Sequence, residues 1–196
     1  MKPFSESCVQ NRQPIIDVLK PLLKDCKELL EIGSGTGQHA VYFAPELPHL
    51  SWQTSELSRH HPGIQLWLDE AALPNVRPPL TLDVLQADWP AILPDAVFSA
   101  NTLHIMSPEM VEACILGVGG LLRPGGLFIV YGPFNYNGEY TSESNARFDQ
   151  WLAGQNPESA IRDFEWVNEL AEDAGMELKD DVAMPANNRI LVWRKL

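Results

Sequence analysis

The sequence feature that most constrains the fold is a short apolar run followed at once by a cluster of glycines. From Leu29 to Gly37 it reads Leu-Leu-Glu-Ile-Gly-Ser-Gly-Thr-Gly, and no helix breaker follows until Pro45. The run predicts a short buried strand, and the breaker-free segment after the glycines predicts a helix. Glycine permits a tight turn and lets a ligand lie against backbone N–H groups. We therefore expect a strand, a loop that holds something polar or anionic, and a helix.

The spacing of these glycines restricts the class of ligand that the loop can be expected to bind. A dinucleotide loop of the form G-x-G-x-x-G would need glycine at Gln38, whereas the third glycine here is Gly37. With the acidic Glu31 before it, this G-x-G-x-G loop resembles motif I of the class I S-adenosylmethionine-dependent methyltransferases. The resemblance implies that the loop wraps the methionine end of the cofactor S-adenosylmethionine. The residues implied to bind it here are Glu31, Gly33, Ser34, Gly35 and Gly37.

The fold class follows from the order of the expected elements and from the same resemblance. We expect one domain over residues 1–196 with a helical cap over 1–28. Class I methyltransferases imply a three-layer αβα, Rossmann-like sheet of seven mostly parallel strands, with the last strand antiparallel. Strands are expected from Leu29 to the glycines and over 50–54, 80–84, 95–103, 127–131, 176–183 and 190–195. Helices are expected over 14–27, 39–44, 62–72, 108–122, 148–152 and 163–174, and Ser107 is expected to cap the fourth of them.

Further cofactor ligands are expected where the second, third and fourth strands end. Glu56 lies about twenty residues past the glycine loop, where Rossmann-like sites use a carboxylate to accept both ribose hydroxyls. The class I resemblance implies that Asp83 accepts from the adenine amino group and that Val84 offers a backbone N–H to the ring. Asn101 lies in the polar carboxyl end of the fourth strand, at the expected switch point of the sheet. A solvated Glu56 at a strand end is the structural alternative.

Two residues are candidates for proton transfer. His104 follows the fourth strand and Tyr131 ends the fifth, so both belong to the edge of the sheet where ligands bind. Methyl transfer from a sulfonium mainly requires alignment and exclusion of water, so a base is needed only for some acceptors. A histidine packed against the following helix and a packed tyrosine are the alternatives.

Residues 132–148 form a long polar and aromatic stretch after the fifth strand, and we expect it to be the substrate wall. A purely structural Ω-loop is the alternative. The best candidates for substrate contact are Asn135, Tyr136, Tyr140 and Ser142.

Composition excludes some partners and favours others. Lys and Arg total 14 against 26 Asp and Glu, and this formal net charge of -12 makes nucleic acid a poor partner. The three cysteines have no metal-ligand spacing, so we expect no metal site and a reducing, cytoplasmic location. No apolar run is long enough to span a membrane. The acidic charge and the aromatic stretch favour a small-molecule acceptor over a protein, and no pattern indicates an oligomeric state.

The whole chain is similar to an uncharacterised methyltransferase-like family known as a domain of unknown function. The motifs that carry this similarity include Tyr131-Gly-Pro-Phe, Thr141-Ser-Glu-Ser-Asn, Ile161-Arg-Asp and Met184-Pro-Ala-Asn-Asn. One departure concerns the ribose contact, since the family usually shows Ser-Asp where this chain has Ser55 and Glu56. The family implies a methyltransferase of unidentified substrate.

Three other functions are weighed against the methyltransferase. A nicotinamide-dependent oxidoreductase is disfavoured by the glycine spacing and by the turn Arg123-Pro-Gly-Gly. A hydrolase has little support because no nucleophile elbow occurs. A non-catalytic module that keeps the fold, and even the cofactor, stays open.

Overall fold

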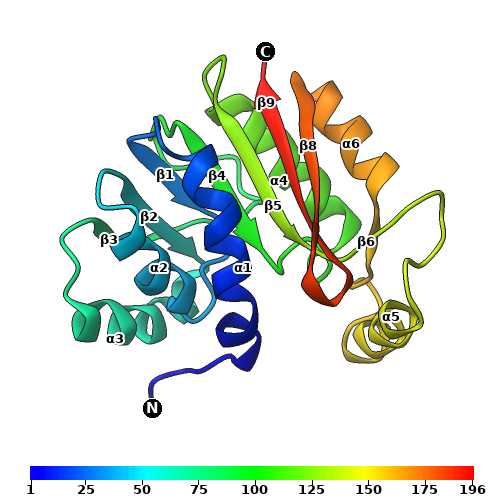
Figure 1. Cartoon of the computed structure of the whole chain (residues 1–196), viewed down its shortest axis with the longest axis horizontal. Coiled ribbons are helices and arrows are strands. Elements are labelled where there is room, and N and C mark those ends of the chain that lie inside the picture. The colour runs from blue at the N-terminus through cyan, green and yellow to red at the C-terminus, as the bar shows by residue number, and fades with distance from the viewer. The chain divides into compact units, whose positions relative to one another are not determined.

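The computed structural model describes all 196 residues, which form two compact units, residues 1–99 and 100–196 (Figure 1). The strands make a seven-stranded sheet of order β3-β2-β1-β4-β5-β9-β8, and two short strands pair separately as β6-β7. The expected α/β, Rossmann-like fold with seven mostly parallel strands is confirmed. No helix combines the length and apolar character that crossing a membrane would require.

In the first unit, parallel strands pack with three helices that lie side by side. β1 pairs with β2, where Leu29 lies opposite Trp52, and with β4, where Leu30 lies opposite Val97. These four side chains are at most 1% exposed, as expected for parallel strands covered on both faces. The elements are α1 (Glu6–Leu22), β1 (Glu28–Glu31), α2 (Gln38–Phe43), η1 (Ala44–Glu46), β2 (Ser51–Glu56), η2 (Ser58–His60), α3 (His61–Ala71), β3 (Val76–Thr81) and β4 (Ala96–Ala100).

The first helix is longer than predicted. We expected it to begin at Pro14, but α1 begins at Glu6 and holds Pro14 and Pro21 within it. Proline removes a backbone donor and usually ends or kinks a helix. Here Ile15, Ile16 and Leu19 are almost fully buried, and their packing outweighs the local cost of proline.

The third strand was predicted over residues 80–84, and this was wrong at both ends. β3 covers Val76–Thr81 and includes Pro78 and Pro79, which lie outside the predicted range. Within the sheet it pairs only with β2, so it is an edge strand. A strand at an edge tolerates proline because one row of its N–H groups needs no partner. Asp83 and Val84 therefore follow the strand instead of ending it.

In the second unit, β9 lies between β5 and β8 and is antiparallel to both, which confirms the predicted antiparallel last strand. Ser107 caps α4 by accepting a bond from Met110 N at 3.2 Å, also as predicted. The elements are α4 (Pro108–Leu121), β5 (Leu127–Gly132), β6 (Phe134–Asn135), α5 (Glu143–Gln155), β7 (Arg162–Asp163), α6 (Phe164–Asp173), β8 (Met176–Met184), η3 (Pro185–Asn187) and β9 (Asn188–Lys195).

The segment 132–148 is more ordered than the long loop that we expected. Its start is strand β6, which pairs in parallel with β7, and its end is the first part of α5. Ser142 caps α5 by accepting from Asn145 N at 3.0 Å, so a helix predicted over 148–152 extends from Glu143 to Gln155. A two-residue strand has no hydrophobic period, and only its distant partner reveals it.

Candidate functional site

The glycine loop follows the carboxyl end of β1 and has the backbone that its glycines predict. Gly33, Gly35 and Gly37 all have positive φ, at 72°, 56° and 88°. A Cβ on Gly37 would lie 3.2 Å from Ile64 Cγ2, so this position has little room for a side chain. A Cβ on Gly35 would meet no atom within 4 Å. Gly35 therefore presents bare backbone to open space.

Beneath the loop, Glu31 is a buried carboxylate with two donors. Ser34 Oγ donates to its Oε2 at 2.8 Å and Trp52 Nε1 donates to the same oxygen at 3.0 Å. Ser34 Oγ in turn accepts from Ser55 N at 3.0 Å, which ties the loop to β2. Burial raises the pKa of Glu31 to about 7, although the two hydrogen bonds act to lower it. Glu31 thus helps to fix the loop through its hydrogen bond with Ser34.

Glu56 ends β2 and reaches the loop with its side chain. Its Oε2 accepts from Gly35 N at 3.1 Å, and its Oε1 accepts from Leu57 N at 2.8 Å. The residue is neither buried nor fully exposed. The structure thus brings Glu56, which lies elsewhere in the sequence, to the glycine loop at Gly35.

Asp83 and Val84 lie just beyond β3. The main-chain oxygen of Glu56 accepts from Leu82 N at 3.2 Å, which ties this turn to the end of β2. The Asp83 carboxylate caps its own turn by accepting from Leu85 N at 3.1 Å, and Val84 is buried. No hydrogen bond joins either residue to the glycine loop.

The N-terminal segment also contacts the loop region, through Gln38, which the sequence did not single out. Gln38 accepts from Ser5 N at 2.6 Å and donates to Ser5 O at 3.2 Å. Its Oε1 also accepts from Thr36 Oγ1 at 2.9 Å. Gln38 is 6% exposed, so this buried amide links the start of α1 to the glycine loop. A lone glutamine after the glycines gave no signal of this.

In the second unit, Asn101 and Tyr131 are joined through their main chains. Asn101 has φ of 56°, a conformation that asparagine tolerates better than most residues, and its N–H donates to Tyr131 O at 2.9 Å. Tyr131 is 4% exposed and lies on β5 opposite Ile190.

His104 lies in the turn after β4 and is 6% exposed. Neither ring nitrogen of His104 has a hydrogen-bond partner. Asn135 Oδ1 is the one side-chain polar atom that is both fully buried and unpaired, so the nitrogens of His104 keep some exposure to solvent. A Cβ on Gly132 would lie 3.6 Å from His104 Nδ1, and Phe148 meets the ring edge-on with centroids 5.4 Å apart. Burial, followed by the charge of Arg162, lowers the pKa of His104 to about 4. The imidazole is therefore neutral and has unpaired nitrogens.

The four expected substrate contacts have different surroundings. Tyr136 donates to Asp181 Oδ2 at 2.8 Å, and burial together with this bond raises the pKa of its hydroxyl. Tyr140 donates to Asp149 Oδ2 at 2.6 Å. Asn135 is 9% exposed with an unpaired Oδ1, and Ser142 is the helix cap described above. Of the four, Asn135 is the one with an unmet hydrogen-bonding atom in the interior.

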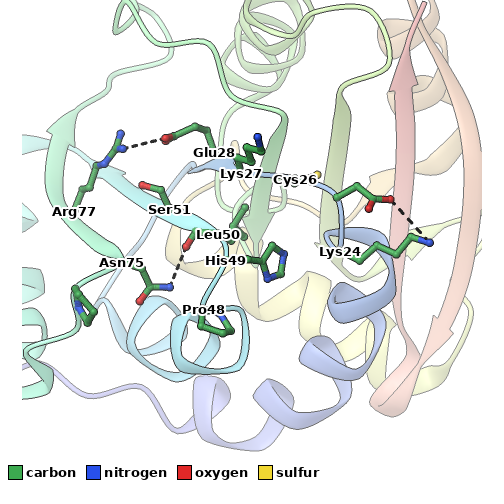
Figure 2. Close-up of a pocket in the computed structure, with 12 residues that line it drawn as sticks. Lys24, Cys26, Lys27, Glu28, Pro48, His49, Leu50, Ser51, Asn75 and Arg77 are labelled. Carbon is green, nitrogen blue, oxygen red and sulfur yellow. Dashed lines mark hydrogen bonds and ion pairs between the residues drawn. The ribbon is translucent and has the colours of Figure 1, made fainter.

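A cavity of about 700 Å³ lies at the opposite ends of the strands (Figure 2). Its lining includes Glu28 and Ser51, which begin β1 and β2, whereas the glycine loop follows the end of β1. Arg77 pairs with Glu28 at 3.0 Å, and Asn75 donates to three main-chain carbonyls, so these polar groups are already used. Ligands of parallel α/β sheets bind at the carboxyl ends, and this cavity is not part of the glycine-loop site. No group of three or more His, Cys, Asp or Glu side chains is arranged to hold a metal ion.

Residues 2–195 match the family model described as "Protein of unknown function (DUF938)". The chain belongs to this family. That match agrees with the similarity inferred from the motifs, and it covers the glycine loop as well as the segments after β5.

Solved structures of methyltransferases share the fold. An O-methyltransferase family protein from Burkholderia thailandensis superposes with a TM-score of 0.85 at 17% identity, covering 97% of this chain and 57% of that one. Human N-acetylserotonin methyltransferase in complex with S-adenosylmethionine gives 0.82 at 14% identity, covering 97% and 53%. An O-methyltransferase family 2 protein from Planctomyces limnophilus in complex with apigenin gives 0.83 at 14% identity, covering 97% and 60%.

These superpositions show that this DUF938 member has the fold of class I methyltransferases. At identities of 14–17% they show the fold alone and not the activity. The chain spans between about half and three-fifths of the length of each of those three proteins.

Proposed function

We propose that this protein is an S-adenosylmethionine-dependent methyltransferase that acts on a small-molecule acceptor. The observation that carries the proposal is the glycine loop itself. Gly35 presents its N–H to the Glu56 carboxylate, and its missing side chain leaves open space, in a fold that methyltransferases share. A backbone surface of this kind accommodates a close-lying polar ligand.

The residues of the first unit fit the adenosyl cofactor. The Glu56 carboxylate is acceptor-only when ionised, as two ribose hydroxyls require, and it already accepts from a backbone N–H. The hydrogen bond between Ser34 and Glu31 helps to fix the loop. The cofactor residues that we propose are Glu31, Gly33, Ser34, Gly35, Gly37, Glu56, Asp83, Val84 and Asn101.

When bound, S-adenosylmethionine would supply an activated methyl group. His104 is proposed to accept the proton that the acceptor hydroxyl or amine loses, because its imidazole is neutral and its nitrogens are unpaired. Tyr131, with its main chain bonded to Asn101, is proposed as a second proton-transfer residue.

Asn135 Oδ1 supports a polar small acceptor. A buried acceptor atom without a donor costs about 1–3 kcal/mol, and a ligand that donates a hydrogen there would remove this cost. Tyr136, Tyr140 and Ser142 complete the proposed acceptor contacts. The apigenin bound by the Planctomyces protein and the net charge of -12 both favour small molecules over nucleic acid. A cytoplasmic location belongs to the same proposal.

A non-catalytic module that binds the cofactor is the second candidate. It stays open because no motif of the sequence identifies a substrate, and a shared fold hosts binding modules as well as enzymes. This candidate predicts cofactor binding without methyl transfer to any acceptor.

Calorimetric titration tests the cofactor assignment. We expect S-adenosylmethionine and S-adenosylhomocysteine to bind with Kd values on the order of micromolar and NAD not to bind. Gly35→Asp should abolish binding by both adenosyl ligands. Gly125→Asp is the matched control, since Gly125 also has positive φ and open space around its Cβ position but lies in the turn before β5. Equal loss of binding in both variants, or NAD binding alone, would contradict the proposal.

A further inference from the structure

We propose that Arg162 is the positioning residue for His104, because its guanidinium holds the turn that carries the imidazole and directs a positive charge toward it. This inference rests on the proposed role of His104 as proton acceptor. It also gives a role to the Ile161-Arg-Asp segment, whose chemistry the sequence had left open.

The hydrogen bonds of Arg162 go to both sides of His104. Nε donates to Leu103 O at 3.3 Å, and the guanidinium also donates to Met106 O. A third bond, 2.7 Å long, goes to Glu158 O, close to Arg162 in the chain. The planar fork of arginine donates in several fixed directions at once, which lysine cannot do. Arg162 therefore fixes the turn from two points.

A neighbouring residue adds a further bond to the same turn. Ser159 Oγ donates to Ile105 O at 2.8 Å, so carbonyls before and after His104 are all held from the 158–162 segment. Within the turn, Ile105 N and Met106 N both donate to Thr102 O, at 3.0 and 3.1 Å. The backbone around His104 thus has little freedom to move.

Arg162 is a cation in the interior of the second unit. It is 8% exposed and takes part in none of the ion pairs of the structure. Burying a charge is costly unless it is well hydrogen-bonded, and the three carbonyls supply those bonds. Burial lowers the pKa of Arg162, and the carboxylate of Asp149, which forms no ion pair with the guanidinium, acts to raise it.

The groups around the imidazole explain why it stays neutral. β5 contributes Gly132 and α5 contributes Phe148, and neither carries a charge. The nearby carboxylate on α5, Asp149, already accepts from Tyr140 Oη at 2.6 Å and from Ile161 N at 2.7 Å. Burial, and after it the charge of Arg162, lowers the pKa of the imidazole to about 4. The lone pair stays available throughout the physiological pH range.

The first test is an NMR titration of the full chain with labelled histidine, without cofactor or acceptor. The chain has 5 histidines, and the His104 signal is assigned by its loss in His104→Gln. We expect no protonation of His104 in the wild type above about pH 5, whereas an exposed histidine titrates near its ordinary pKa of about 6.5. Titration of wild-type His104 at the ordinary value would overturn the proposal without any variant of Arg162.

The second test removes the charge. In Arg162→Gln we expect the pKa of His104 to rise by up to about one unit, at most a tenfold gain in proton affinity, because burial is the larger cause of its shift. His39 is the internal control, because burial and Arg12 lower its pKa to about 4 in the first unit. Arg12→Gln should raise the pKa of His39 and leave His104 unchanged. An unmoved His104 in folded Arg162→Gln would refute the charge effect.

A third variant distinguishes the effect of the Arg162 charge on His104 from its effect on the position of the His104 ring. It also provides a test if Arg162→Gln does not fold. Arg162→Lys keeps the charge but loses the fork, so the pKa of His104 should stay low while the ring-current shift from Phe148 changes. An unchanged shift would refute the positioning role. Failure of adenosyl ligands to bind would remove the proposed function alone, since the titration needs no ligand.

Discussion

The side-chain amide of Asn145 donates a hydrogen bond of 3.3 Å to the main-chain carbonyl of Asn187. The same amide donates to Thr141 Oγ1 at 3.0 Å, and Asn145 is 5% exposed. The start of α5 is thereby joined to the turn between β8 and β9, where Ala186 and Asn187 both have positive φ. Two distinctive sequence segments, 141–145 and 187–188, are thus parts of one contact.

Replacing Asn145 by alanine should destabilise the protein by about 1–3 kcal/mol, because both hydrogen bonds of its buried amide are lost. Asn188→Ala is the control, since Asn188 bonds only within its own turn, to Pro185 O and Ala186 O. Urea unfolding followed by circular dichroism measures both. Equal stabilities of the two variants would show that the contact between the segments contributes little.

Two adjacent glycines of α4 should respond to alanine in opposite directions. A Cβ on Gly119 would lie 2.6 Å from Ala174 O and 2.7 Å from Ala174 Cβ, whereas one on Gly120 would meet nothing within 4 Å. Gly119→Ala should therefore cost about 1–3 kcal/mol through overpacking against α6. Gly120→Ala should stabilise by about 0.5–1 kcal/mol through helix propensity. Thermal unfolding of both variants decides, and the prediction fails if Gly119→Ala melts no lower than the wild type.

The buried Glu31 carboxyl should make stability depend on pH. Its folded-state pKa of about 7 lies above the ordinary 4.5, so its stabilising contribution is complete below about pH 4.5 and is lost as pH rises through 7. Glu31→Gln lacks this titration. Relative to the wild type, we expect the free energy of unfolding of the variant to rise by on the order of 2–3 kcal/mol between about pH 5 and pH 8.

His39 and His104 act with the opposite sign, because their lowered pKa values remove stability as pH falls below the ordinary 6.5 toward about 4. Both histidines are present in Glu31→Gln, so the difference from the wild type isolates Glu31. Denaturant unfolding at several pH values provides this difference. A difference that does not change with pH would mean that Glu31 is already ionised in the folded state at pH 5.

Two substitutions of Glu56 should show whether the length or the charge of its side chain matters for cofactor binding. Glu56→Gln keeps the length but loses the ionised acceptor, and we expect adenosyl ligands to bind about 10–100-fold more weakly. Glu56→Asp, the residue that the family usually has there, should bind within about threefold of the wild type. Calorimetry with S-adenosylhomocysteine measures both. Unchanged affinity in Glu56→Gln would remove Glu56 from the proposed ribose site.

Local sequence by itself determined the glycine loop, the cap of α4 and most strand positions. Gly33 to Gly37 interrupt an apolar run, and Ser107 precedes Pro108, so neighbours in the chain were sufficient. The antiparallel order of β5, β9 and β8 came from the family resemblance, which carries topology that local pattern lacks.

Tertiary structure alone decided the features that depend on distant partners. β3 accepts Pro78 and Pro79 because it lies at the sheet edge, and α1 extends through Pro14 because its apolar face is buried. β6 exists only through pairing with β7. The lowered pKa of His104 comes from burial and then from Arg162, which is distant in the chain, because burial and charge act through space and leave no periodic pattern in the sequence.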